Sequence, residues 1–526
     1  MIGGELDRMA MAVLQPGFEG TEPPGWLRRA LGDGLGGVVL FARNIARNVT
    51  RDGARDGARD GARDGARNVT HDGSPAGDAL AGTAALVAEL RRERPDVVVA
   101  VDEEGGAVTR LEAATGSSWP GNMALGVAGD ESLTRRVARQ IGRMVAAAGV
   151  TLDYAPVVDV NADPRNPVIG VRSFGCDPEE VGRHGAAWIE GLQSAGVAAC
   201  AKHFPGHGDT VTDSHLALPA VRASREVIER RDLPPFRAAI AAGVRAVMCG
   251  HLLVPAVDTL PATLSREVLT GLLREELGFE GLAVTDAIEM RAVAALHEPG
   301  EIAVRALAAG ADAICVGVSS AGGESVYALR DAITRAVREG RLAEERLAEA
   351  AGRVRDLAVW YAAQAEARAA VARDADEGLG LAAATAALRA TPAGQAVTPL
   401  TKAPLVVHLT ARPSQAVGRA TPLKLGQAIE EILPGTVTAE VHEDGRLPGL
   451  GETDRPLVIA VHDAARHAWM RRLLDDALRA RPDAVVVETG VPGPPAGRLY
   501  LATHGNSTAS ARAAARWLTG GLRPSS

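Results

Sequence analysis

Residues 198–215 read Ala-Ala-Cys-Ala-Lys-His-Phe-Pro-Gly-His-Gly-Asp-Thr-Val-Thr-Asp-Ser-His, an apolar run that ends in polar residues and a loop with two glycines. The run at 198–203 has the character of a strand that is covered on both faces. The glycines prevent the next segment from forming a stable helix. Asp213 and His215 are two residues apart, so in an extended chain both point to one side. A carboxylate beside an imidazole fixes the ring tautomer and raises its basicity, which suits a general acid/base.

Seven further apolar runs resemble this one. Together the eight runs are 9–14, 37–41, 97–102, 151–155, 198–203, 246–251, 282–286 and 313–318. Helix-like patterns lie between them, at 86–94, 132–148, 179–195, 235–242 and 299–309. Eight strand–helix units in about 330 residues predict an α/β fold with a (β/α)8, or TIM, barrel. A doubly wound sheet alternates in the same way, but it does not readily bring the third, fifth, sixth and seventh strands to one point.

Polar residues stand at the C-terminal ends of several runs: Asp102, Lys202, His203, His251 and Asp286. The rim at these strand ends is where barrel enzymes build their active sites. A carboxylate that ends a strand is costly to bury unless it is paired or used, so Asp286 is a candidate catalytic residue. A helix cap or a salt bridge is the alternative for Asp286. A solvated turn is the alternative for the acidic run at 102–104, and a core histidine is the alternative for His251.

The chain has 526 residues, too many for one hydrophobic core. We predict a catalytic domain at 1–372 that ends in a long helix at 342–370, then a linker at 373–400. A smaller C-terminal α/β sandwich is predicted at 401–526, with strands at 405–409, 436–441, 457–461, 484–488 and 498–502. An insert at about 44–77 contains four copies of Arg-Asp-Gly-Ala and almost no apolar residues, which predicts disorder.

Composition excludes several classes of function. The net charge is −8 and no basic patch is evident, which argues against nucleic acid as a partner. No segment approaches a membrane span, and the first residues do not resemble a signal peptide. The four cysteines lack metal-type spacing and are expected to be free thiols in the cytoplasm. No metal and no cofactor are expected, and the oligomeric state is left open.

Residues 202–219, KHFPGHGDTVTDSHLALP, resemble the signature loop of the β-N-acetylglucosaminidases of glycoside hydrolase family 3. Four other segments are similar to motifs of that family, in the same order: 101–110, 155–161, 169–174 and 284–290. The resemblance covers residues 5–365, roughly. The chain departs from the family at Glu103, Ala107 and Ala287, where glutamine, arginine and aspartate are frequent. None of these changes removes a proposed catalytic group.

The resemblance implies that Asp286 is the nucleophile, that His215 is the acid/base and that Asp213 is the partner of His215. The residues implied to hold the N-acetylglucosamine unit are Asp102, Arg110, Arg172, Lys202 and His203. The two glycines of the signature loop are expected to let it swing His215 in and out. Because His215 supplies the proton, the C-terminal domain is expected to be structural or to shape the aglycone side.

The implied reaction is a double displacement that retains the β configuration. The expected substrate is a terminal, non-reducing β-linked N-acetylglucosamine on a peptidoglycan (muropeptide) fragment in cell-wall recycling. Phosphate in place of water would make the protein a phosphorylase, because a neutral imidazole base does not repel an anion. A non-catalytic sugar-binding protein is the third possibility. The joint presence of Asp286, Asp213 and His215 argues against it.

Overall fold

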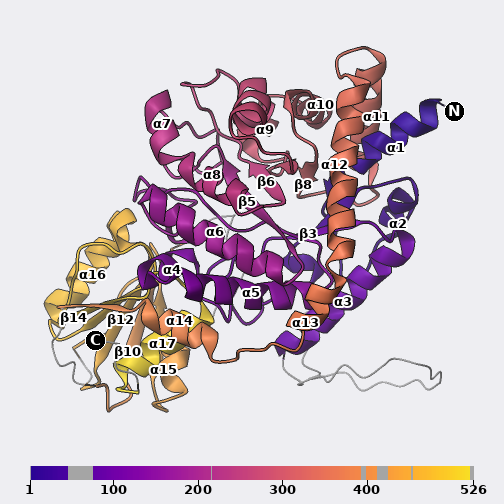
Figure 1. The fold of residues 1–526 in the computed structure, drawn as a ribbon. Helices are drawn as coiled ribbons and strands as arrows, with labels where there is room; N and C mark the ends of the chain where they lie inside the picture. Colours follow the sequence, from indigo (N-terminus) through magenta and orange to yellow (C-terminus); the bar gives the residue numbers. More distant parts are fainter. Residues whose placement is uncertain are drawn as a thin grey trace, which may run out of the picture.

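Parallel strands lie at the centre of the N-terminal part of the molecule, and helices surround them (Figure 1). The computed structural model describes residues 2–45, 75–214, 216–392, 399–411, 424–451 and 454–521. Six strands form one parallel sheet in chain order. They are β2 (Gly37–Leu40), β3 (Val98–Val101), β4 (Leu152–Asp153), β5 (Ala198–Phe204), β6 (Ala246–Cys249) and β7 (Leu282–Thr285).

Two more strands connect the edges of this sheet. β1 (Leu14–Pro16) pairs in parallel with β8 (Ile314–Val316). Single parallel bridges place β1 beside β2 and β8 beside β7. The sheet therefore curls on itself, and the prediction of an α/β fold around a parallel sheet is confirmed.

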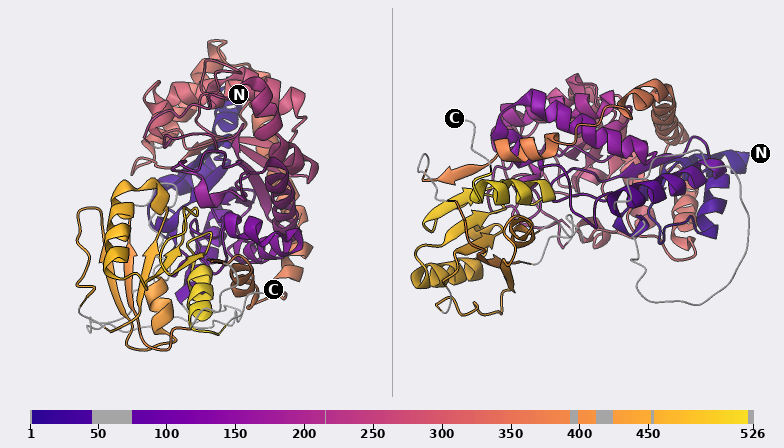
Figure 2. Two further views of the ribbon diagram at one scale, coloured as in Figure 1. Left: turned by 90° about the vertical axis from the view of Figure 1, so that its left-hand side faces the viewer. Right: turned by 90° about the horizontal axis from the view of Figure 1, so that it is seen from below.

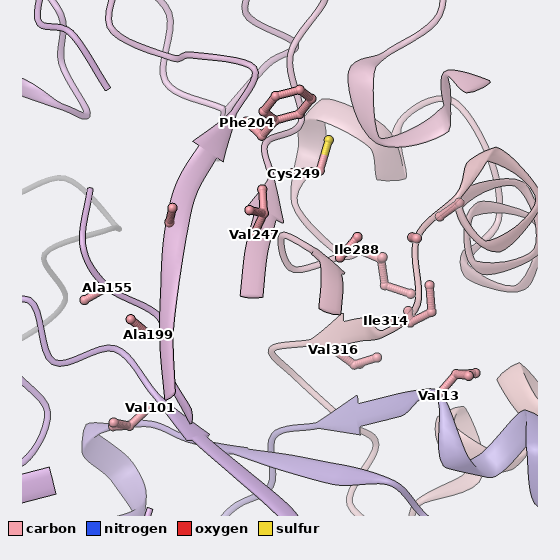
Figure 3. Packing of buried hydrophobic residues seen from close by; sticks show 14 of the residues in the cluster. Val13, Val101, Ala155, Ala199, Phe204, Val247, Cys249, Ile288, Ile314 and Val316 are labelled. Atoms are coloured by element: carbon pink, nitrogen blue, oxygen red, sulfur yellow. The ribbon is translucent and has the colours of Figure 1, made fainter. Parts of the chain in front are cut away.

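In several strands, successive residues belong to different hydrophobic clusters, as the two faces of a sheet require. In β5, Ala198 and Cys200 join a cluster to which the strands β2 to β8 contribute, on the inner face of the curl. Ala199 joins the cluster between the sheet and the helices, part of which Figure 3 shows. Lys202 continues the series from Ala198 and Cys200. The alternation therefore places Lys202 on the inner face at the C-terminal end of β5.

Helices cover the outer face of the curled sheet (Figure 1). They are α1 (Ile2–Ala12), α2 (Gly25–Gly32), α3 (Pro75–Glu93), α4 (Asn122–Ala128), α5 (Glu131–Ala147), α6 (Pro178–Ser194), α7 (Arg225–Arg231), α8 (Pro234–Ala241), α9 (Arg291–Ala294), α10 (Pro299–Ala309), α11 (Glu324–Arg338) and α12 (Glu344–Ala363). α12 adds Val354 and Leu357 to the inner cluster. Its Trp360 ring lies 5.1 Å from the guanidinium of Arg245, just before β6. α12 therefore closes the end of the curl at which the strands begin, and polar side chains gather at the other end.

The structure differs from the predicted elements at three places. The run at 9–14 was predicted as a strand, but residues 9–12 belong to α1 and β1 begins at Leu14. Short apolar runs of buried helices and of strands look alike, and α1 packs against α11 and α12. The helix predicted at 342–370 is interrupted at Gln364, before α13 (Ala365–Val371). Most of the predicted disordered insert, residues 46–74, lies outside the described residues.

A second six-stranded sheet, with the order β11-β10-β12-β13-β14-β9, lies in the C-terminal part (Figure 2). Its strands are β9 (Arg389–Thr391), β10 (Leu405–Leu409), β11 (Val437–Val441), β12 (Leu457–Val461), β13 (Val485–Glu488) and β14 (Leu499–Ala502). One face packs against α14 (Leu379–Ala386), α15 (Leu425–Glu430) and α17 (Thr508–Leu518), and the other against α16 (Ala468–Ala480). The five predicted strands are present. The predicted linker, 373–400, includes α14 and β9.

Candidate active site

A cavity of about 920 Å³ lies at the C-terminal ends of the strands. Residues at the ends of β3 to β8 line it: Asp102, Tyr154, Lys202, Met248, Asp286 and Gly317. All the residues predicted to hold the sugar line it too: Asp102, Arg110, Arg172, Lys202 and His203. Asp213 is not a lining residue, although its neighbour Ser214 is. His215 lies outside the described residues.

Four charged side chains form a paired group on one wall of the cavity. The Nζ of Lys202 lies 2.7 Å from Asp102 Oδ1 and 2.7 Å from Glu104 Oε1. Arg172 binds both oxygens of Glu104, with Nε–Oε2 at 2.9 Å and Nη2–Oε1 at 2.7 Å. Burial disfavours the ionised form of Glu104. The charges of Arg172 and Lys202 outweigh this effect and hold the pKa of Glu104 well below its usual range. The carboxylates likewise hold the pKa of Lys202 above its usual value, against the effect of burial. Lys202 and Glu104 are therefore both charged at neutral pH.

A short turn between β4 and α6 carries Arg172 into this group. Asn166 Oδ1 accepts hydrogen bonds from the backbone N–H groups of Val168 and Ile169, at 2.9 and 2.8 Å. Gly170 has a φ of 47°, in the left-handed region that favours glycine. Arg172 Nη1 donates to the carbonyl of Val168 at 3.0 Å. These contacts fix the backbone of the turn and the direction of the Arg172 side chain.

Asp159, which is fully buried, binds the backbone and side chain of the signature loop. Its Oδ2 accepts a hydrogen bond from His203 Nδ1 at 2.8 Å, and its Oδ1 accepts one from the backbone N–H of His207 at 2.7 Å. Burial acts to raise the pKa of Asp159, but the charge and hydrogen bond of His203 outweigh it and lower that pKa. An ionised Asp159 can only accept, so His203 Nδ1 carries a proton. Nε2 of His203 is then the ring nitrogen left for a substrate hydroxyl.

His207 fixes the loop that leads to Asp213. Its Nδ1 lies 2.8 Å from Thr210 Oγ1, and its Nε2 lies 3.3 Å from Ser214 Oγ. Burial, together with the charge of His203, lowers the pKa of His207 to about 4, so the ring is neutral at neutral pH. Gly208 packs so closely that a side chain there would collide with the carbonyl of Val160. This glycine is therefore needed for packing.

Asp286 is held through the backbone on both sides. Its N–H donates to the carbonyl of Cys249 in β6 at 3.0 Å, and its Oδ1 accepts a hydrogen bond from Ala287 N–H at 2.8 Å. His251 Nε2 donates to the carbonyl of Ala287 at 3.0 Å, while its Nδ1 lies 2.8 Å from Thr263 Oγ1. His251 is thus a buried brace behind the peptide that follows Asp286, and it is absent from the cavity wall.

The three acidic residues at 102–104 have different surroundings and different partners. Glu103 is fully buried, and its Oε2 accepts hydrogen bonds from the N–H groups of Arg110 and Leu111, both at 2.9 Å. Burial, with the charge of Glu112, raises the pKa of Glu103 to about 7. The turn fixed in this way places Arg110 Nη2 3.9 Å from Asp102 Oδ2. Within the described ranges, no group of His, Cys, Asp and Glu residues has the arrangement of a metal site.

Sequence reasoning assigned no individual role to Glu104, Asp159 or Glu289. Each lies in a segment that it singled out, 101–110, 155–161 or 284–290. Glu104 binds two cations, Asp159 binds the signature loop and Glu289 lines the cavity. The segments were therefore recognisable from the sequence. The roles of the three carboxylates were not, because their partners lie tens of residues away and are set by the fold.

The C-terminal part reaches the turn that carries Arg172. A Cβ placed on Gly170 would lie 3.4 Å from Val491 Cγ2, in the loop after β13. Gly505 lines a small crevice with Glu104 and Arg172. The N-terminus of α17 is tied to the same region, because its first N–H, at Thr508, donates to the carbonyl of Ser117 at 3.1 Å.

Among the described helices, none is long and apolar enough to cross a lipid bilayer.

Relatives of this chain carry related names. The chain is 40% identical over 234 residues to a β-hexosaminidase of Pseudomonas aeruginosa, a match that covers 43% of this chain and 68% of that protein. It is 37% identical over 251 residues to β-hexosaminidase A of Pseudoalteromonas piscicida. That match covers 44% of this chain but only 42% of the relative, so the chain spans less than half of the relative's length.

A solved structure and a family model cover more of the chain. The structure of a glycoside hydrolase family 3 β-N-acetylglucosaminidase from a Paenibacillus species aligns with a TM-score of 0.82 and 33% identity. The alignment covers 99% of this chain and 97% of that one. Residues 31–357 match the model described as the glycosyl hydrolase family 3 N terminal domain. The chain therefore belongs to glycosyl hydrolase family 3.

Proposed function

We propose that the protein is a retaining exo-β-N-acetylglucosaminidase, which hydrolyses terminal, non-reducing β-linked N-acetylglucosamine. The observation that carries this proposal is that Asp286 shares one cavity with the paired charges of Asp102, Glu104, Arg172 and Lys202. Such fixed charges offer both donors and acceptors to sugar hydroxyls. The relatives named β-hexosaminidase and β-N-acetylglucosaminidase support the same reaction.

In the first step, Asp286 attacks the anomeric carbon and a covalent glycosyl-enzyme forms. The hydrogen bond from Ala287 N–H and the brace by His251 hold the carboxylate and its peptide in one orientation. A nucleophile that is already oriented reaches the transition state with less loss of entropy.

His215 donates a proton to the leaving oxygen in the first step and removes one from water in the second. Asp213 orients the ring of His215. An imidazole with an ordinary pKa, near 6.5, exchanges protons readily around neutral pH. The contact between Ser214 Oγ and His207 Nε2 supports this assignment, because it keeps the chain between Asp213 and His215 at the cavity.

The substrate that we propose is a peptidoglycan (muropeptide) fragment, processed in the cytoplasm during cell-wall recycling. Arg291 lines the same cavity and suits a carboxylate of such a fragment. The four cysteines are free and three are buried, which suits a reducing compartment.

In architectural terms, we propose a (β/α)8 barrel at 1–372 and a smaller α/β sandwich at 401–526. The sandwich supplies no catalytic group in this scheme. Its contacts with Gly170 and with the crevice beside Arg172 support the sugar-binding wall from behind.

Nitrophenol release from an aryl β-N-acetylglucosaminide, with and without phosphate at matched ionic strength, tests the proposal. Release that does not depend on phosphate is expected for the hydrolase. Release that requires phosphate and yields a sugar 1-phosphate would assign the second candidate, a phosphorylase. No release, from this glycoside or from a muropeptide, would refute the enzyme assignment and favour a sugar-binding protein.

A further inference from the structure

Glu289 is a carboxyl group on the wall of the substrate cavity to which the mechanism above gives no role. It follows Asp286 by three residues, and both line the cavity. The segment between them is tied to β8, because Ile288 N–H donates to the carbonyl of Cys315 at 3.1 Å. The position of Glu289 relative to Asp286 is therefore set by the backbone.

One oxygen of Glu289 faces the chain after β8, and the other lacks a partner. A side chain at Gly317 would collide with Oε1, so the glycine leaves the space that the carboxyl group occupies. The backbone N–H groups of Glu289, Val318 and Gly317 act to lower the pKa of this carboxyl group. Oε2 is buried and has no hydrogen-bond partner among the described residues. Buried polar atoms in native proteins are nearly always paired, so an exception of this kind in a cavity wall calls for a ligand or a water.

Arg43, a cationic side chain that lines the same cavity, has its hydrogen bonds elsewhere. Its Nη2 donates to the carbonyl of Gly317 at 2.5 Å and its Nε to that of Phe18 at 2.9 Å. It also pairs with Glu19 at 3.0 Å. Its described hydrogen bonds therefore go to other groups, and Glu289 acts on Arg43 through charge.

The ionisation of Glu289 suits an acceptor of hydrogen bonds. Burial raises the pKa of Glu289 to about 6, with the charge of Asp286 adding to the rise and nearby backbone N–H groups opposing it. At neutral pH, Glu289 is then ionised in most of the molecules. An ionised carboxylate accepts strong hydrogen bonds from hydroxyl and amide groups.

We propose that Glu289 is a substrate-binding residue, whose Oε2 accepts a hydrogen bond from a donor group of the bound glycoside. Glu289 follows β7 and its carboxyl group faces the chain after β8, whereas Arg172 follows β4, so the two side chains come from different sides of the ring of strands. The donor belongs either to the N-acetylglucosamine unit or to the leaving group. The inference rests on the proposed function, in that the ligand is a glycoside bound at Asp286.

Calorimetric titrations in an Asp286→Asn background test this without turnover. The ligands are N-acetylglucosamine and its β-1,4-linked disaccharide, and the added changes are Glu289→Gln and Glu289→Ala. Glu298→Gln is the matched control, since Glu298 is an exposed carboxyl group that does not line the cavity. Loss of a hydrogen bond to a charged acceptor should weaken binding by about tenfold or more. The melting temperature of Glu289→Gln should stay the same or rise, because the change removes a buried charge and keeps the shape of the side chain.

The outcomes separate the sources of the donor. Weaker binding of both ligands would place it on the N-acetylglucosamine unit, and weaker binding of the disaccharide alone would place it on the leaving group. Unchanged binding of both ligands would overturn the proposal, as would weaker binding that tracks a lower melting temperature in both variants. If the wild type turns over no glycoside and the Glu289 changes still weaken binding, the glycosidase assignment fails while this one stands.

Discussion

Replacement of Glu103 by glutamine tests whether a buried carboxyl group beside the substrate cavity titrates near neutral pH. Oε2 of Glu103 accepts two backbone hydrogen bonds, from Arg110 and Leu111, while Oε1 has no partner within the part of the chain that the structure describes. Burial, with the charge of Glu112, raises the pKa of Glu103 from 4.5 to about 7. Glutamine keeps an acceptor for both N–H groups and carries no charge.

The sign of the effect follows from proton binding. Between pH 4.5 and about 7, the folded protein keeps a proton on Glu103 that the unfolded chain has released. The free energy of unfolding therefore falls as the pH rises through this window, by at most about 1.4 kcal/mol per pH unit. The total loss is roughly 3 kcal/mol and is complete above pH 7 or so. Glu103→Gln removes the titrating group, so its advantage over the wild type should grow by that amount between pH 4.5 and pH 8.

Urea unfolding of both proteins at pH 5, 6, 7 and 8, followed by circular dichroism and tryptophan fluorescence, measures this difference. Glu298→Gln serves as the control, since an exposed carboxyl group should give a difference that does not change with pH. A Glu103→Gln variant that is less stable than the wild type by the same amount at every pH would refute the reasoning. That result would mean that the folded protein holds Glu103 ionised.

Three further changes test the proposed site. Asp286→Asn should lower turnover of an aryl β-N-acetylglucosaminide about 10³-fold or more while calorimetry still detects sugar binding, and unchanged turnover would exclude Asp286 as the nucleophile. Asp213→Asn should slow cleavage of the disaccharide about tenfold more than cleavage of a nitrophenyl glycoside, whose leaving group needs little protonation. Equal slowing of both would contradict a role for Asp213 as the partner of His215. Val491→Asp should raise KM roughly tenfold with little change in kcat, because a charge in this half-buried contact displaces the Arg172 turn. An unchanged KM would show that this contact does not support the turn.

The strands were predictable because strands buried on both faces are written as continuous apolar runs. The same runs gave the rim residues, since Asp102 and Asp286 each follow the last residue of a strand. The alternation through Ala198, Cys200 and Lys202 places the lysine on the inner face. The run at 9–14 misled because Met11 is buried in a helix that packs on other helices, and periodicity does not distinguish that case over so few residues.

The pairings within the site were not predictable from local sequence. Glu104 and Arg172 are 68 residues apart and meet only because a turn after β4 faces the loop after β3. The support from Val491 depends on how the C-terminal part docks, for which no local pattern exists. Glu289 shows the same limit, since its environment is created by the glycine at 317 on the neighbouring strand end.

The charges on the proposed sugar-binding wall give a reason why the C-terminal part, to which we assign no catalytic group, is expected to matter for binding. The wall holds two cations, Lys202 and Arg172, against two carboxylates, Asp102 and Glu104, so a neutral sugar meets donors and acceptors that are already in place. If the Arg172 turn moved, Glu104 would keep its pair with Lys202 but lose its bidentate partner while still buried, and breaking a buried ion pair is destabilising. The contact from Val491 therefore acts on the ion pair and not on the sugar. We therefore expect the C-terminal part to contribute to substrate binding through the direction of one arginine.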